Sequence, residues 1–425
     1  MKKILSLLLC FVFLAAAGCS VTGGGTDDAD DSGTDGGAGD SGGTTVTLAD
    51  NSGMEDSMYD LKTYLYPVWE GTTVYNETLW FAAGNTAPLL YTPDEVLSVK
   101  SYDLGTTYTE NVDYVVDGGE IVRTDSSDIP YMTEAQYYPS SPPSSASVAR
   151  DDGTYWYIVE GDDISKRQVT VTYTHSDIVD WTLPRDDSAK LSKTVEKLES
   201  GETLKVVFYG DSITVGANSS EYLCIEPYAE SYANMVKSYL AARYPGATID
   251  FVNNAVGGTD SNWGNGVSSG VDAIDSLYES EGDHFQARVL DEDPDLLFIA
   301  FGMNDQESSP YVSYRSNIAS MIEKVRAQNP DVEIVLVASM IANPETAYYN
   351  KDYEAYQDAL IELGETYDNV AVSTTYNTVM SVYDAGVRFQ DCTANNANHP
   401  NDFMMRLYAQ TLLYTMFGED YIDYI

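Results

Sequence analysis

The run Leu204-Lys205-Val206-Val207-Phe208-Tyr209, followed directly by Gly210-Asp211-Ser212, decides how this chain is expected to fold. The β-branched and aromatic side chains predict a buried strand, and the glycine after them predicts a tight turn. A serine is thereby placed at the C-terminal edge of a strand, where open α/β sheets bind their ligands. Alone it indicates no more than a helix cap, because a serine hydroxyl also accepts hydrogen bonds from the first turn of a helix.

From this strand onward, apolar strands alternate with amphipathic helices. Strands are expected at Leu204–Tyr209, Thr248–Asn253, Leu296–Phe301, Val332–Ala338 and Val370–Ser373, and helices at Tyr228–Ala242, Tyr311–Gln328, Tyr353–Thr366 and 402–416. Near-continuous apolar strands between such helices predict a parallel sheet covered on both faces, which is an α/β fold. A helical connector in residues 184–203 leads into this domain, which is taken as residues 204–425.

Residues 46–183 have a different character. Short β-rich runs, such as Leu97–Tyr102 and Gln168–Tyr173, are separated by Asp-Gly, Gly-Gly and proline-rich turns. Strands at this spacing predict an all-β sandwich, jelly-roll-like, ahead of the α/β domain. The stretch Tyr155-Trp156-Tyr157 is typical either of cross-strand packing or of a platform for sugar rings, and packing is favoured because aromatic side chains fill cores more often than they mark ligand sites.

Three further polar segments lie where the sheet predicts a common edge. Residues 253–259 contain Gly257-Gly258, residues 302–305 contain Asn304, and His399 precedes the final helix. The carboxyl ends of parallel strands meet at one edge, so these segments are expected to converge on Ser212. A serine nucleophile needs a base for its proton, and His399 is the best placed of the three histidines in the chain.

In this order the four segments resemble the sequence blocks of the SGNH, or GDSL-type, hydrolase family, which supply Ser, Gly, Asn and His. The matching residues are Ser212, Gly258, Asn304 and His399. The resemblance implies a flavodoxin-like three-layer α/β/α hydrolase domain in which Ser212 attacks an acyl carbonyl and His399 carries the proton. It further implies an oxyanion hole formed by the Gly258 N–H and the Asn304 side-chain amide, both of which are suitable donors.

In this family an acidic residue usually orients the histidine and completes a catalytic triad with it and the serine. At the position of this acid the chain departs from the family pattern. The family places an aspartate three residues before the histidine, and here that residue is Asn396. Three alternatives stay open: a Ser-His dyad helped by a backbone carbonyl, Asn396 as the residue that orients the ring, or Asp391 folding back to it. Asp391 and the dyad are favoured, because an asparagine cannot stabilise the positive charge of the imidazolium.

Family members with a β-domain before the hydrolase domain are often carbohydrate acetylesterases. The resemblance therefore implies removal of acyl groups, O-acetyl above all, from an acetylated polysaccharide or oligosaccharide outside the cell or in the periplasm, through an acyl-enzyme. A first alternative is a lipase, thioesterase or acyltransferase of the same fold. A second is a catalytically inactive glycan-binding surface lipoprotein, since fold alone does not determine function.

The N-terminus predicts export. Met1-Lys2-Lys3 and the apolar run Ile4–Ala17 are typical of a signal peptide, taken as residues 1–18. The small residues before Cys19 resemble a bacterial lipoprotein processing site, with Cys19 as the lipidated residue. Residues 19–45 consist mainly of Gly, Asp, Ser and Thr and predict a disordered tether. We expect an exported lipoprotein at the outer membrane or cell surface, which contacts the membrane through its lipid alone.

Composition narrows the possible partners. A formal net charge of -45 argues against nucleic-acid binding, because such a surface repels phosphate. No phosphate loop, dinucleotide fingerprint or metal-ligand spacing is present in the sequence, so no cofactor and no metal are expected. Cys224 and Cys392 flank the serine and histidine segments, and in an exported chain they form either a disulfide or two free thiols. The sequence does not indicate an oligomeric state.

Overall fold

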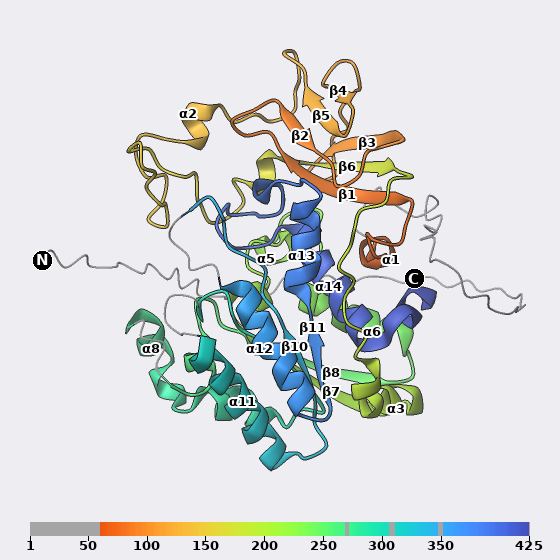
Figure 1. Cartoon of the computed structure of the whole chain (residues 1–425), viewed down its shortest axis with the longest axis vertical. Helices are drawn as coiled ribbons and strands as arrows, with labels where there is room; N and C mark the ends of the chain where they lie inside the picture. The colour runs from red at the N-terminus through yellow and green to blue at the C-terminus, as the bar shows by residue number, and fades with distance from the viewer. Residues whose placement is uncertain (1–59, 268–271, 306–310, 347–351, 425) are drawn as a thin grey trace, which may run out of the picture.

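The computed structural model describes residues 60–267, 272–305, 311–346 and 352–424. The expected signal peptide, the expected tether and Cys19 lie outside these residues. Figure 1 shows a β-rich N-terminal part, coloured orange to yellow, above a parallel sheet surrounded by helices. The expected fold class, an α/β domain preceded by a β-rich part with antiparallel sheets, is confirmed.

The N-terminal part is built from two antiparallel sheets of three strands, with the orders β1-β6-β3 and β2-β5-β4. Its strands are β1 (Thr73–Trp80), β2 (Thr86–Pro88), β3 (Glu95–Ser101), β4 (Tyr114–Asp117), β5 (Glu120–Arg123) and β6 (Gln168–Thr174). Its helical pieces are α1 (Leu61–Leu65), α2 (Glu134–Tyr137) and η1 (Ser165–Arg167). In β1 every residue is buried, which fits a strand covered on both sides.

The C-terminal sheet contains five strands in the order β11-β10-β9-β7-β8, and all neighbours are parallel. They are β7 (Thr203–Gly210), β8 (Thr248–Asn253), β9 (Leu296–Ala300), β10 (Glu333–Val337) and β11 (Val370–Ser373). This is the flavodoxin-like order. The chain first adds β8 on one side of β7 and then adds β9, β10 and β11 in turn on the other side. The strand β7 therefore lies between β8 and β9.

Helices connect these strands. The α-helices are α3 (Ser192–Ser200), α4 (Ser212–Val215), α5 (Ser220–Leu223), α6 (Tyr232–Arg243), α7 (Ser261–Gly264), α8 (Asp272–Tyr278), α9 (His284–Arg288), α11 (Tyr311–Gln328), α12 (Tyr353–Thr366), α13 (Thr375–Asp384) and α14 (Asp402–Phe417). Short 3-10 helices are η2 (Ser188–Lys190), η3 (Glu279–Glu281), η4 (Leu290–Glu292), η5 (Phe389–Asp391) and η6 (Gly418–Tyr424). Within the described part of the chain, no helix has the length and apolar character needed to cross a membrane.

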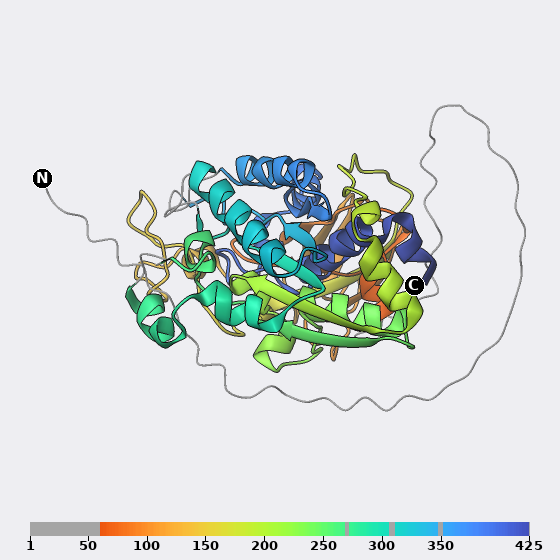
Figure 2. The same cartoon turned by 90° about the horizontal axis from the view of Figure 1, so that it is seen from below.

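The strand β7 shows how the sequence pattern creates two covered faces. Val207 and Tyr209 belong to the core cluster on the side of α11 and α12, whereas Val206 and Phe208 belong to the cluster on the side of α6 and α14. This alternation is the two-residue period of a strand. In Figure 2 the cyan and blue helices α11 and α12 lie together on one side of the molecule.

The core on the α6 and α14 side continues into the N-terminal part. Leu79 of β1 and Val169 of β6 share a single apolar cluster with Phe403 and Leu412 of α14. The helix α14 also contacts β1 directly. A shared core of this kind holds the two parts in one arrangement, because moving them apart would expose apolar surface to water. Side chains of the N-terminal part therefore have fixed positions relative to the edge of the parallel sheet.

Candidate active site

Ser212 is the first residue of α4, and Asp211 alone separates it from the end of β7. The Asp211 carboxylate caps this helix by accepting a hydrogen bond of 3.0 Å from the Ile213 N–H. Gly210 leaves no room for a larger residue, since a Cβ there would collide with the backbone carbonyl of Ala300. The Ser212 residue is 7% exposed, so its hydroxyl is fixed at the sheet edge and still reachable.

His399 meets Ser212 across the sheet edge. Its Nε2 lies 3.0 Å from the Ser212 Oγ, within hydrogen-bond distance. The loop that carries the ring is held by Asn395, whose side-chain oxygen accepts hydrogen bonds from the N–H groups of Ala397, Asn398 and His399. Because Asn395 is fully buried, this loop has little freedom, and the ring is held in place.

The other ring nitrogen of His399 faces two acceptors. Nδ1 lies 2.6 Å from the Asn218 side-chain oxygen and 3.3 Å from Oε2 of Glu160. The Asn218 amide has a defined orientation, because its Nδ2 donates to the carbonyl of Gly161 at 3.1 Å. With acceptors on this side, the neutral ring carries its proton on Nδ1 and presents Nε2 as an acceptor to the serine hydroxyl. That is the tautomer that a general base requires.

Glu160 and Asn218 are site residues that sequence reasoning missed. Glu160 lies in the N-terminal part, far from His399 in the sequence, and no local pattern indicates that the two meet. Asn218 has a local signal: it follows Gly216, where α4 ends, and has a φ of 66°. Asparagine tolerates this left-handed conformation better than most residues, so an Asn just after the serine helix indicates a turn back toward the site.

The expectation that Asp391 orients the ring is wrong. Its Oδ1 accepts hydrogen bonds from the Trp80 N–H at 2.7 Å and from Arg388 at 2.8 Å, and its Oδ2 accepts from Arg388 Nε at 2.7 Å. Asp391 is fully buried, so these partners fix its carboxylate. It joins η5 to β1 and does not contact His399.

Asn396, at the position where the family has its acid, also faces away from the ring. It has a φ of 59°, which is a left-handed backbone conformation. Its Nδ2 donates to the Tyr137 hydroxyl and to the Tyr157 carbonyl, each at 3.1 Å. Both partners belong to the N-terminal part. Asn396 therefore connects the histidine loop to that part and is not the residue that orients the imidazole.

The two cysteines do not form the disulfide that was considered. Cys224 is exposed, whereas Cys392 is buried, and no disulfide joins them. Burial raises the pKa of the Cys392 thiol well above its ordinary value, which favours the neutral thiol. The alternative of two thiols is the one that the structure contains.

The loops after β8 and β9 flank Ser212, because these strands are the two neighbours of β7. A Cβ on Gly257 would lie 3.6 Å from the Ser212 Cβ, so this loop lies against the serine. Gly258 has a φ of +79°, which favours glycine. Asn304, after β9, donates its Nδ2 to the Thr259 carbonyl at 2.9 Å and so joins the two loops. Both expected oxyanion donors thus lie on loops beside Ser212.

Asp211 and Glu160, which both interact electrostatically with His399, differ in their pKa values. Burial raises the pKa of Asp211 to about 7, against the opposing effect of its hydrogen bond from Ile213. Burial also tends to raise the pKa of Glu160, but the nearby His399 and hydrogen bonds from His399, Asn395 and Asn218 together lower it below its ordinary value. At neutral pH Glu160 is therefore the ionised carboxylate beside the imidazole.

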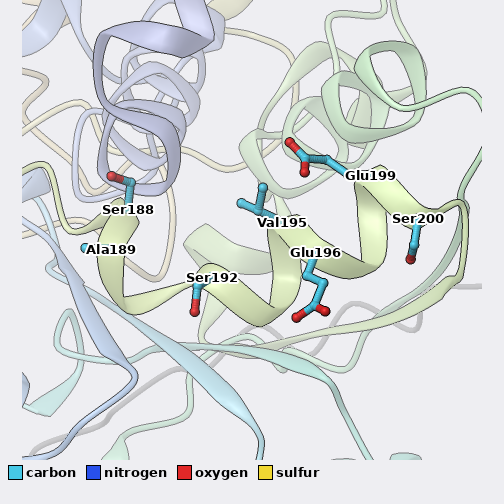
Figure 3. A pocket seen from close by; sticks show the side chains of 7 residues that line it. All are labelled: Ser188, Ala189, Ser192, Val195, Glu196, Glu199 and Ser200. Carbon is cyan, nitrogen blue, oxygen red and sulfur yellow. The ribbon is translucent and has the colours of Figure 1, made fainter.

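A pocket elsewhere on the molecule is separate from this site. Figure 3 shows it along η2 and α3, where it is lined by Ser188, Ala189, Ser192, Val195, Glu196, Glu199 and Ser200. None of these residues contacts Ser212 or His399, and the helix leads into the opposite, N-terminal end of β7. The pocket is therefore a surface depression apart from Ser212 and His399.

Residues 208–407 match the sequence model of the GDSL-like lipase/acylhydrolase family. No curated protein matches the chain. Among solved structures, a two-domain esterase active on acetylated mannans, co-crystallized with mannopentaose, is similar, with 22% identity over 55% of this chain and 54% of its own and a TM-score of 0.41. An acetylxylan esterase from Geobacillus stearothermophilus has 17% identity over 50% of this chain and 94% of its own, with a TM-score of 0.37. The chain thus spans about half the length of the two-domain esterase.

Proposed function

We propose that this protein is a serine esterase, on the premise that its residues 208–407 belong to the GDSL-like lipase/acylhydrolase family. One observation carries the proposal: the Ser212 Oγ and the His399 Nε2 lie 3.0 Å apart at the carboxyl edge of the parallel sheet. A hydroxyl and an imidazole at this distance form the nucleophile and base of acyl transfer.

The proposed reaction has two steps. The Ser212 Oγ bonds to the acyl carbon while its proton moves to His399 Nε2, and the imidazolium then gives this proton to the departing alcohol. In the second step a water molecule, deprotonated by the same nitrogen, attacks the acyl-enzyme. The acid leaves, and the Ser212 hydroxyl regains its proton from His399.

The negative oxygen that develops in each step needs hydrogen-bond donors. The backbone N–H groups of Ser212 and Gly258 and the side-chain amide of Asn304 are the proposed donors. Support comes from the position of their loops beside the serine and from the bond of 2.9 Å by which Asn304 joins them. Donors held in place before reaction stabilise the transition state without reorganisation.

We propose a short acyl group, acetyl, on a carbohydrate as the substrate. The side chains at His399 Nδ1, Asn218 and Glu160, are polar, whereas a long acyl chain would need an apolar channel. The net charge of -45 also favours neutral polymers over anionic ones.

Two measurements test this function. Initial rates with aryl esters of increasing chain length should fall sharply beyond acetate, and acetylated plant or algal polysaccharides should release acetate. Ser212→Ala should abolish both activities. Ser192→Ala, an exposed serine on α3, is the matched control and should keep the wild-type rate. Equal rates on long esters favour a lipase, and binding of polysaccharide without any hydrolysis favours an inactive glycan-binding protein.

We further propose that the protein is an exported lipoprotein anchored through Cys19. The support is the sequence pattern of residues 1–19, which lie outside the described part of the chain. In a bacterial host, the wild-type protein should be found in the membrane fraction and should incorporate a labelled fatty acid. Cys19→Ala should lose the label, and equal labelling of both proteins would contradict the proposal.

A further inference from the structure

The position that normally supplies the acid of the site is occupied by Asn396, which donates to Tyr137 and Tyr157 instead. The imidazolium formed during acyl transfer nevertheless needs a negative charge near Nδ1. Among the described residues, the carboxylate found at this nitrogen is that of Glu160, with its Oε2 at 3.3 Å. The Asn218 oxygen lies closer, at 2.6 Å, but it is neutral.

Glu160 is held in place by the same residue that holds the histidine loop. Its Oε1 accepts a hydrogen bond of 3.0 Å from Asn395 Nδ2. The oxygen of Asn395 accepts the N–H groups of Ala397, Asn398 and His399. One buried side chain therefore fixes both the ring and the carboxylate, which is the arrangement expected of two groups that act together.

We propose that Glu160, supplied by the N-terminal β-rich part, is the acidic positioning residue of the Ser212 and His399 site. This inference rests on the proposed esterase function. Glu160 accepts from the protonated Nδ1 together with Asn218: the amide orients the ring, and the carboxylate stabilises its positive charge. Glu160 stays ionised throughout, and the proton that moves is the one transferred between Ser212 Oγ and His399 Nε2.

Other carboxylates near the site are less suited to this role. Asp391 is bound by Arg388 and by the Trp80 N–H. Asp211 affects His399 only through space, and its Oδ1 caps α4. Since burial brings the pKa of Asp211 to about 7, this group is partly neutral at neutral pH and a weaker source of charge than Glu160.

The segment that carries Glu160 is attached firmly to the hydrolase part. The Tyr157 carbonyl accepts from Asn396, and the Gly161 carbonyl accepts from Asn218. Trp156 and Ile158 share an apolar cluster with Ala397 of the histidine loop. Asn396, at the usual position of the acid, thus helps to anchor the segment that brings in a different acid. The N-terminal part is then a component of the active site.

The test compares variants of the full chain on an aryl acetate. Glu160→Gln keeps the size of the side chain and an oxygen for Asn395, but removes the charge. We expect kcat to fall about 10²-fold and KM to stay within about twofold of wild type. The loss should be smaller than on replacing the acid of a Ser-His-Asp triad, because Asn218 still orients the ring. The melting temperature should stay close to that of the wild type.

A rescue variant separates charge from structure. Asn218→Asp, added to Glu160→Gln, places a carboxylate at the nearer position beside Nδ1 and should restore kcat at least about 10-fold. Tyr157→Phe is the matched control: it removes the bond of 2.7 Å from the Tyr157 hydroxyl to Asp163 in the same segment, without touching Glu160. It should leave kcat within about twofold of wild type.

Two results would overturn the inference while leaving the esterase function intact: a wild-type kcat for Glu160→Gln, or an equal loss in Tyr157→Phe, which would mean that disturbance of the segment is the cause. Asn218→Asp also loses the hydrogen bond to the Gly161 carbonyl, so the double variant is compared with Glu160→Gln in melting temperature as well. At an equal melting temperature, failure to raise kcat would overturn the role of charge. A wild-type protein no faster than Ser212→Ala on every ester would overturn the proposed function, and the inference with it.

Discussion

Ser212 and His399 are separated by 187 positions in the sequence, yet their Oγ and Nε2 atoms lie 3.0 Å apart. The parallel sheet produces this contact, because β7 delivers the serine at its end and the loop before α14 returns to the same edge. The backbone on both sides is fixed: Gly210 permits the tight turn, and Asn395 holds the histidine loop.

Replacing His399 by alanine should remove the base and leave the fold intact. We expect kcat on an aryl acetate to fall at least about 10³-fold, since serine is a poor nucleophile without a base. The ring is only partly buried, so thermal unfolding monitored by circular dichroism should change little. A variant that keeps a tenth of the wild-type kcat would show that another group takes the serine proton.

Asn304→Ala tests the oxyanion donors. Loss of one preorganised donor should lower kcat about 10²-fold and leave KM nearly unchanged, because the donor acts mainly on the charge of the transition state. The loss includes any loosening of the Thr259 loop, to which Asn304 donates. Steady-state kinetics on aryl acetate check this prediction. A raised KM with wild-type kcat would indicate instead a residue that binds the ground state.

Asn396→Asp restores the family's usual residue at this position, but it should not raise esterase activity. The side chain is fully buried and its Nδ2 donates to the Tyr157 carbonyl, so a carboxylate would place two acceptors against each other. We expect a loss of about 1 to 3 kcal/mol in the free energy of unfolding, measured in urea, and no gain in kcat. A higher kcat with unchanged stability would mean that residue 396 can reach the imidazole.

The regular elements of the α/β domain could be predicted from the sequence because each carries its own local signal. The strands Thr248–Asn253 and Val370–Ser373 and the helices Tyr311–Gln328 and Tyr353–Thr366 have the bounds that apolar runs and helical periodicity indicate. The helix α13 (Thr375–Asp384) was not predicted, although Thr378, Val379 and Val382 form its buried face; it is a short helix that follows β11 almost directly.

Residues of the site could be predicted only where the expected reaction needs a given residue type and the sequence places that residue beside a recognisable strand or helix. Ser212 and His399 were expected to meet because each lies beside a recognisable element and the proposed reaction needs both, and their side chains lie 3.0 Å apart. Glu160 could not be found, since its contact with His399 depends on how the N-terminal part packs against the sheet. Asp391 was a wrong prediction because nearness in the sequence does not reveal that Arg388 and the Trp80 N–H already bind its carboxylate.

Glu77 should make stability depend on pH. It is fully buried, accepts hydrogen bonds from Tyr173 and from the Leu90 N–H, and burial raises its pKa to about 8 from an ordinary 4.5. Between these values the folded chain keeps a proton that the unfolded chain releases, so Glu77 lowers the free energy of unfolding as the pH rises from about 4.5 to about 8.

Glu77→Gln should remove this contribution. Relative to wild type, the variant should lose less stability between pH 5 and pH 8, by a difference on the order of a few kcal/mol. Urea unfolding at both pH values measures it. Parallel losses in the two proteins would show that Glu77 is ionised in the folded state across this range.

Cys224 and Cys392 should both react as thiols, because no disulfide joins them. In protein made without its first 19 residues and unfolded without reductant, both Cys224 and Cys392 should react with a thiol reagent. In the folded protein Cys224 should react rapidly, whereas burial should slow Cys392 by at least about tenfold. An absence of reactive thiols in the unfolded, unreduced chain would establish a disulfide.

Trapping the acyl-enzyme is the most direct test of the central claim, that Ser212 is the nucleophile and His399 its base. Wild-type protein is mixed with an aryl acetate, quenched in acid during turnover, digested and analysed by mass spectrometry. The account predicts one acetyl group on the peptide that contains Ser212, and none in Ser212→Ala, which should also lose its activity. Turnover in Ser212→Ala at the wild-type rate, with no acetyl group on Ser212 in the wild type, would contradict it.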